Sequence, residues 1–96
     1  MKVLALEKDR AGTSSADNAA LLAAEAKAVW DLCQSGTIRE IYFREVESQA
    51  VLVLEVPSTR EAERLLAGLP LARAGLIEFE VIGLRPYPGF SRLFAP

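Results

Sequence analysis

Three features of the sequence predict an α+β fold in which strands and helices follow one another as β-α-β-β-α-β. Residues 17–34 consist largely of Ala, Leu, Glu and Lys, which are strong helix formers. An alternating segment at 38–44 and an apolar run at 50–56 are separated by a polar loop, which is typical of an antiparallel hairpin. A second amphipathic helix is expected over 58–68 and a last strand over 76–84. This order is typical of the ferredoxin-like arrangement, a four-stranded antiparallel sheet with two helices on one face.

The ends of these elements are predicted from residues that start or stop regular structure. The first strand is expected at 1–6, followed by a charged loop at 7–10. Ser14 or Ser15 is the expected N-cap of the first helix, and Ser58 begins a capping box at the second. The whole chain is expected to form one domain, because a second would lack room for its own core.

The composition limits the functions open to the chain. Lys and Arg number 11 against 13 Asp and Glu, and the pI is about 5.1, so the basic surface that nucleic-acid binding needs is missing. His is absent and Cys33 is the only cysteine, which excludes a disulfide within the chain and a metal site of several cysteines. We find no phosphate-binding loop or dinucleotide fingerprint, and we expect no cofactor. The chain start lacks the apolar length of a signal peptide and no segment is long enough to span a bilayer, so we expect a cytoplasmic protein that binds no membrane.

A second copy of the chain is the expected partner. The run 51–54 is apolar on both faces of its strand, although a sheet with one wetted face should alternate. We therefore expect two sheets to pair face to face as a dimeric α+β barrel, a homodimer or a ring of dimers. Residues 85–96 are expected to form a C-terminal arm that reaches over the partner with Tyr87, Phe90 and Phe94. The alternative is that the arm folds back on its own helices.

Charged residues within apolar strands are candidates for a site, because the burial of an isolated charge is costly. These residues are Arg39, Glu40, Glu55, Glu78 and Glu80. If Phe43 pairs with Val51 in the hairpin, Arg39 lies opposite Glu55. Glu55 would then be a general base and Arg39 an anchor for an anionic substrate. The alternative is a structural ion pair.

The first helix supplies further candidates. Its apolar face is predicted to be buried and consists of Leu22, Ala26, Val29, Trp30 and Cys33. Glu25 lies on the flank of this face, where it could act as a base in a crevice between helix and sheet. Trp30 would line a substrate pocket or belong to the core. On the second strand, Tyr42 offers a hydroxyl that could stabilise a developing oxyanion.

The chain resembles the muconolactone isomerase family over roughly residues 25–88. The resemblance rests on short segments in a matching order: the helix end at Leu32 to Gly36, then IREIYFR with Arg39, VLVLEV with Glu55, Leu69-Pro70-Leu71, IEFEV, and Leu84 to Pro88. It implies a small, cofactor-free protein of the ferredoxin-like fold, assembled as dimers or rings of dimers, that moves a double bond by proton transfer.

The resemblance also places Glu25, Arg39 and Glu55 at positions where the family has like residues in or near its pocket. Three positions depart from the family pattern: Tyr42 stands where a tryptophan is usual, and Glu40 and Tyr87 stand where the isomerase has histidines.

The sequence thus favours a cofactor-independent isomerase that acts on a small lactone or unsaturated carboxylic acid. In this hypothesis Glu55 or Glu25 is the general base, Arg39 binds the substrate carboxylate, Tyr42 donates a hydrogen bond and Trp30 contacts the substrate. Two alternatives remain: a non-catalytic dimeric binding or assembly domain of the same fold, and a cofactor-free monooxygenase-like barrel.

Overall fold

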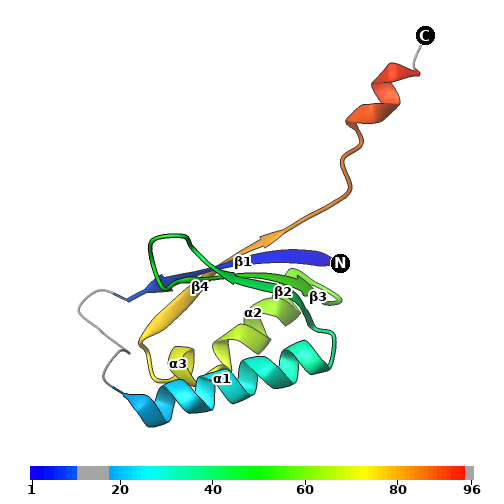
Figure 1. Cartoon of the computed structure of the whole chain (residues 1–96). Helices are drawn as coiled ribbons and strands as arrows, with labels where there is room; N and C mark the ends of the chain where they lie inside the picture. The colour runs from blue at the N-terminus through cyan, green and yellow to red at the C-terminus, as the bar shows by residue number, and fades with distance from the viewer. Residues whose placement is uncertain (11–17, 95–96) are drawn as a thin grey trace.

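The computed structural model describes residues 1–10 and 18–94 (Figure 1). Its elements in this part of the chain are β1 (Lys2–Asp9), α1 (Ala19–Gln34), β2 (Ile38–Phe43), β3 (Ala50–Glu55), α2 (Thr59–Ala67), α3 (Pro70–Arg73), β4 (Ile77–Gly83) and the 3-10 helix η1 (Gly89–Leu93). Among the helices that the structure describes, none combines the length and the apolar character that crossing a membrane requires.

The four strands form one sheet in the order β2-β3-β1-β4, and every neighbouring pair is antiparallel. The helices α1, α2 and α3 lie on one side of this sheet (Figure 1). The predicted β-α-β-β-α-β ferredoxin-like fold is therefore confirmed. The short helix α3, which begins at Pro70, was not expected from the sequence.

The strand β1 ends at Asp9, three residues beyond the predicted end at Leu6, which corrects the expected loop at 7–10. Pairing with β4 continues through Glu7 opposite Phe79 to Asp9 opposite Ile77. Because side chains alternate along a strand, Glu7 lies on the same face as the buried Val3 and Ala5. Only 8% of Glu7 is exposed, so the charged run continues the strand and carries a carboxyl group into the interior.

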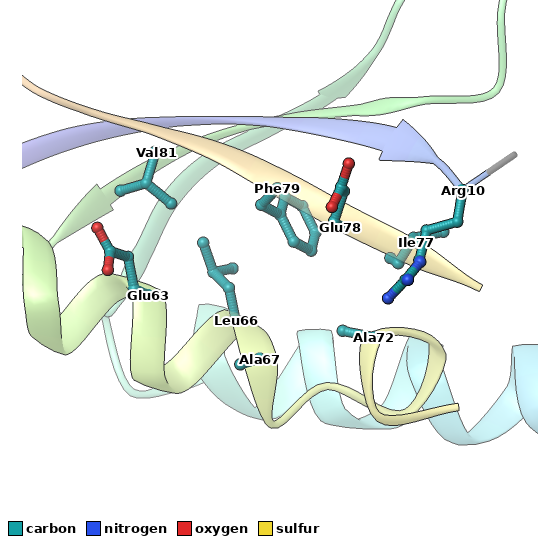
Figure 2. A pocket seen from close by; sticks show the side chains of 9 residues that line it. All are labelled: Arg10, Glu63, Leu66, Ala67, Ala72, Ile77, Glu78, Phe79 and Val81. Atoms are coloured by element: carbon teal, nitrogen blue, oxygen red, sulfur yellow. The ribbon is translucent and has the colours of Figure 1, made fainter. Parts of the chain in front are cut away.

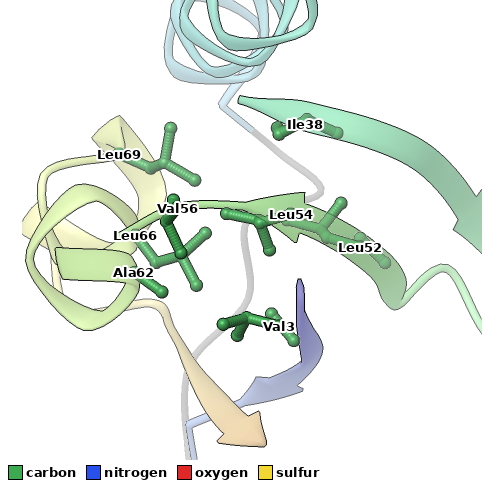
Figure 3. Packing of buried hydrophobic residues seen from close by; sticks show 10 residues of the cluster. Val3, Ile38, Leu52, Leu54, Val56, Ala62, Leu66 and Leu69 are labelled. Atoms are coloured by element: carbon green, nitrogen blue, oxygen red, sulfur yellow. The ribbon is translucent and has the colours of Figure 1, made fainter. Parts of the chain in front are cut away.

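The hydrophobic core lies between α2 and the inner face of the sheet (Figure 3). Val3, Leu52 and Leu54 come from the two central strands, and Ala62 and Leu66 meet them from α2. All five side chains are almost completely buried. The most completely buried contacts between a helix and the sheet therefore lie under α2.

The helix starts are fixed by side-chain caps. The Ser58 hydroxyl accepts a hydrogen bond from the Glu61 backbone N–H at 3.1 Å, which confirms Ser58 as the cap of α2. At α1 the cap is Asn18, whose side chain accepts from the Leu21 N–H at 2.9 Å. Ser14 and Ser15, the predicted caps, lie outside the described residues.

The outer face of the sheet carries no helix, and we call it the open face (Figure 1). Strand register places an apolar stripe along its middle, where Leu6 lies opposite Val51 and Leu4 lies between Val53 and Ile82. The segment after β4 extends away from the sheet and helices, so the alternative in which it folds back on them is wrong (Figure 1). Tyr87 and Phe90 pack edge to face within this arm, at 5.0 Å between ring centroids.

Candidate functional site

A cavity of about 700 Å³ separates α1 from the inner face of the sheet. It is lined by Glu7, Leu22, Glu25, Ala26, Val29, Trp30, Cys33, Ile41, Phe43, Ser48, Ala50 and Leu71. The five residues predicted as the buried face of α1 are all among them. None of the sixteen residues of α1 is fully buried, however. The prediction that this face is buried is therefore wrong for Leu22, Ala26 and Trp30, which are exposed. Val29 and Cys33 are partly buried, and they pack against the core as well as lining the cavity.

Glu7 enters this cavity from β1. The backbone N–H of Ala50 on the neighbouring strand β3 donates a hydrogen bond to its carboxyl group. Burial raises the pKa of Glu7 above its ordinary value of 4.5, and the negative charges of Asp9 and Glu25 raise it further. Glu7 therefore retains its proton to a higher pH than an exposed glutamate.

Glu25 enters the same cavity from α1. Its Oε1 accepts a hydrogen bond from the backbone N–H of Leu71, at 2.9 Å, in the first turn of α3. Burial raises the pKa of Glu25, and the Leu71 hydrogen bond opposes this rise because it stabilises the charged form. The unpredicted helix α3 thus orients a carboxyl group that the sequence had singled out.

Glu7 and Glu25 are close enough for the charge of Glu25 to raise the pKa of Glu7. Two interacting carboxyl groups in one poorly solvated space do not ionise together easily. Glu7 is the more buried of the two, and each carboxyl group accepts a hydrogen bond from a backbone amide. The cavity thus holds two interacting carboxyl groups whose pKa values are both raised.

Apolar and aromatic side chains form the rim. Trp30 from α1 is 59% exposed and Phe43 from β2 is 67% exposed, and both line the cavity. Their rings offer flat surfaces to a ligand. Among the described residues, no three His, Cys, Asp or Glu side chains gather in a way that could hold a metal ion.

Two of the predicted site residues, Glu25 and Trp30, lie together in this cavity. Glu55 does not line it; its Oε2 forms an ion pair with the N-terminal amine of Met1 at 2.6 Å. That hydrogen bond lowers the pKa of Glu55, with a smaller effect from the charge of Arg39. The Arg39 Nε donates instead to the Gly36 carbonyl at 2.6 Å.

The predicted pairing of Arg39 with Glu55 is wrong because the hairpin register differs by one residue. Phe43 lies opposite Ala50, and the register is irregular between Ile38 and Glu40, where Arg39 lies. A shift of one residue moves every side chain to the other face of a strand. Phe43 consequently faces the cavity and not the open face.

Tyr42 lies opposite Val51 and belongs to the open face. Its hydroxyl donates to the Glu40 Oε1 at 2.7 Å, and this hydrogen bond raises the pKa of Tyr42. The structure therefore separates Arg39, Tyr42 and Glu55 from the cavity of Glu25. Their roles in a site remain predictions.

Glu7 is the site residue that sequence reasoning missed. The available signal was the alternation Val3, Ala5, Glu7, which places Glu7 on the inner face if the strand continues. The charged residues that follow Glu7, at positions 8–10, favoured a loop instead of a continued strand.

A smaller cavity of about 260 Å³ lies between α2 and β4 (Figure 2). Its charged side chains Arg10, Glu63 and Glu78 are exposed at the surface. It holds no buried carboxyl group, so the cavity under α1 is the better candidate site.

The raised pKa of Glu7 predicts a pH-dependent gain in stability for Glu7→Gln. A carboxyl group whose folded pKa lies above 4.5 contributes its stability below that pH and loses it as the pH rises through the folded pKa. Gln cannot ionise, so we expect the variant to have the higher free energy of unfolding near neutral pH and no such advantage near about pH 4. Urea unfolding across this range measures the difference, with the exposed Glu45→Gln as control. A gain in stability of Glu7→Gln that grows towards acid pH would contradict the raised pKa of Glu7.

Comparison with solved structures agrees with this architecture. Muconolactone isomerase superposes with a TM-score of 0.73 at 26% sequence identity, over 92% of each chain. A 5-chloro-2-hydroxyhydroquinone dehydrochlorinase from Burkholderia phenoliruptrix AC1100, in complex with 2,5-dihydroxybenzoquinone, superposes with a TM-score of 0.72 at 20% identity, over 93% of this chain and 98% of that chain. No protein-family model matches the chain, and no curated protein matches it at a significant level. The fold of this chain is that of muconolactone isomerase, as the resemblance in its sequence indicated.

Proposed function

We propose that the chain is a cofactor-independent enzyme of the isomerase or lyase type that moves a proton on a small unsaturated ring compound such as a lactone. The observation that carries this proposal is the pair of carboxyl groups, Glu7 and Glu25, with raised pKa values in one apolar cavity. The similar structures support it, because one is an isomerase and the other a dehydrochlorinase.

The two carboxyl groups suit the two needs of proton transfer next to a carbonyl. Glu25, as carboxylate, removes a proton from a carbon conjugated with the carbonyl group, and the electron pair moves towards the carbonyl oxygen. Glu7, in its protonated form, donates a hydrogen bond to that oxygen and stabilises the negative charge. Return of the proton from Glu25 to a different carbon completes the shift of the double bond. If a chloride is displaced instead, the same proton removal leads to elimination.

The walls of the cavity assist this chemistry. Val29, Ile41 and Leu71 keep the reacting atoms in an environment of low polarity, where hydrogen bonds to a developing charge are stronger than in water. The same environment raises the pKa of both carboxyl groups towards the pH at which a general acid and base work best.

Solvent exchange tests the proposal directly. Purified protein is incubated with muconolactone, and separately with its uncharged methyl ester, in deuterated buffer from about pH 5 to about pH 9, and proton NMR follows deuterium at each ring and side-chain carbon. We expect enzyme-dependent deuterium uptake at the carbons next to the double bond, together with isomerised product. Heat-denatured protein is the control. No exchange above the control at any pH would contradict the function.

We further propose that a second copy of this chain covers the open face and forms a homodimeric barrel. The apolar stripe of Leu4, Leu6, Val51, Val53 and Ile82 supports this, because it lies on a face that the helices leave uncovered. The arm supports it as well, since Phe90, Leu93 and Phe94 are exposed and Phe94 is 85% exposed. The stripe and the arm are both exposed apolar surfaces, and both would be covered in a homodimer.

A further inference from the structure

We infer that the cavity under α1 selects uncharged ring compounds over carboxylates, an inference that rests on the proposed function of this cavity. The decisive observation is its charge. Glu7 and Glu25 project into it, and among the described residues that line it none is Lys or Arg. Residues 11–17 carry no Lys or Arg in the sequence either.

Arg39, which the sequence offered as an anchor, and two lysines on β1 and α1 are engaged elsewhere. Arg39 donates to the Gly36 carbonyl outside the cavity, at 2.6 Å. Lys8 pairs with Glu80 on the open face at 3.3 Å, and Lys27 pairs with Asp31 on the solvent side of α1 at 2.6 Å. A substrate carboxylate in the cavity would therefore meet two acidic groups and, among the described lining residues, no Lys or Arg.

A negatively charged ligand in this space is unfavourable for two reasons. It loses its hydration without gaining a positive partner, and it repels Glu25 in a medium that screens charge weakly. Glu25 would respond by taking up a proton, which removes the base that the reaction needs. An uncharged ligand avoids both effects.

The polar groups of the cavity suit carbonyl and hydroxyl groups. Glu7 offers a hydrogen-bond donor when it is protonated, Glu25 offers an acceptor, and Ser48 at the rim offers a hydroxyl. Trp30 and Phe43 contact the faces of a flat ring at the rim. The ligand class is thus a neutral, flat lactone, enone or hydroxylated ring.

Muconolactone and its methyl ester form a matched pair for the test, since they differ only in the charged group. Trp30 is the only tryptophan of the chain and lines the cavity, so quenching of its fluorescence reports binding without turnover. We expect the ester to bind at least about tenfold more tightly than the acid near neutral pH. Equal or tighter binding of the acid, or no binding of either ligand, would overturn the inference.

The result separates this inference from the proposed function. Binding of the ester without deuterium exchange in either ligand would support the neutral-ligand site and contradict the proton-transfer function. Exchange that favours the acid would support the function and contradict the selectivity.

A charge introduced at the rim provides a second test. Ser48 is exposed and lines the cavity, so Ser48→Arg should place a cation there without disturbing the core. We expect the preference for the ester to fall by about tenfold or to reverse. The control is Val46→Arg, in the same loop but 92% exposed and outside the cavity, which should keep the ester preference. An unchanged preference in Ser48→Arg would contradict the electrostatic explanation.

Discussion

Replacing Glu25 with Gln is expected to lower turnover and deuterium exchange by about 10²- to 10⁴-fold, the usual contribution of a general base. Gln has nearly the same shape, and its amide oxygen can still accept the hydrogen bond that Leu71 donates to Glu25. The variant should therefore fold normally, and binding of the ester in the cavity should still quench the fluorescence of Trp30. Measuring kcat and KM by NMR separates this loss of chemistry from a loss of binding.

Two other glutamates make this experiment specific. Glu45 lies on the exposed loop between β2 and β3, outside the cavity, so Glu45→Gln should leave turnover unchanged. Glu55→Gln distinguishes the two hypotheses for the base, because Glu55 was proposed from the sequence but lies outside the cavity, paired with the Met1 amine. A large loss in Glu55→Gln together with normal turnover in Glu25→Gln would place the chemistry on the open face.

Glu7→Gln should be less damaging than Glu25→Gln, because a Gln side chain still carries N–H donors for a carbonyl oxygen. It should also stabilise the fold near neutral pH, as described above. A variant that gains stability while losing activity would show that the buried carboxyl group is kept for chemistry, since it lowers the stability of the folded chain.

The fold was predictable from the sequence because it depends on the order and period of apolar segments. The apolar run of β3 and the helix-forming composition of α1 can each be recognised within one segment of the chain. Ser58 was equally clear, since a helix cap is a local hydrogen bond between neighbouring residues.

The site was predictable only in part, because it depends on contacts between segments distant in the sequence. Periodicity identified the face of α1 that carries Trp30, but it cannot tell whether a face meets a packed core or a cavity. Glu25 acquires its environment from α3, a single turn begun by Pro70. The irregular register near Arg39 places that residue away from Glu55, its expected partner, and no local sequence pattern predicts such a shift.

Introducing a charge in the apolar stripe of the open face is expected to convert a dimer into a monomer. Val53 is the best position, because it lies between Leu4 and Glu40 in the middle of this face and is only half-buried in one chain. In a single chain Lys at this position can extend into water, so Val53→Lys should fold. In a face-to-face dimer the same charge would be buried without a partner and would prevent association.

Light scattering coupled to size exclusion at micromolar concentration measures this change. The expected result is a dimer or a ring of dimers for the unaltered chain and a monomer for Val53→Lys, with Val46→Lys on the exposed loop as control. Circular dichroism establishes that the monomer is folded. A stable monomer for the unaltered chain would contradict the barrel.

The arm should determine how tightly the two copies hold together. A specific dimer buries roughly 1,200–2,000 Å² in total, which is more than a stripe of five aliphatic side chains can supply from each copy. Aromatic side chains bury large areas, and Tyr87, Phe90 and Phe94 are all exposed on the arm. Truncation after Leu84 is therefore expected to weaken the dimer without unfolding the sheet, since the arm extends away from it (Figure 1). A truncated chain that dimerises as tightly as the full chain would show that the open face is sufficient.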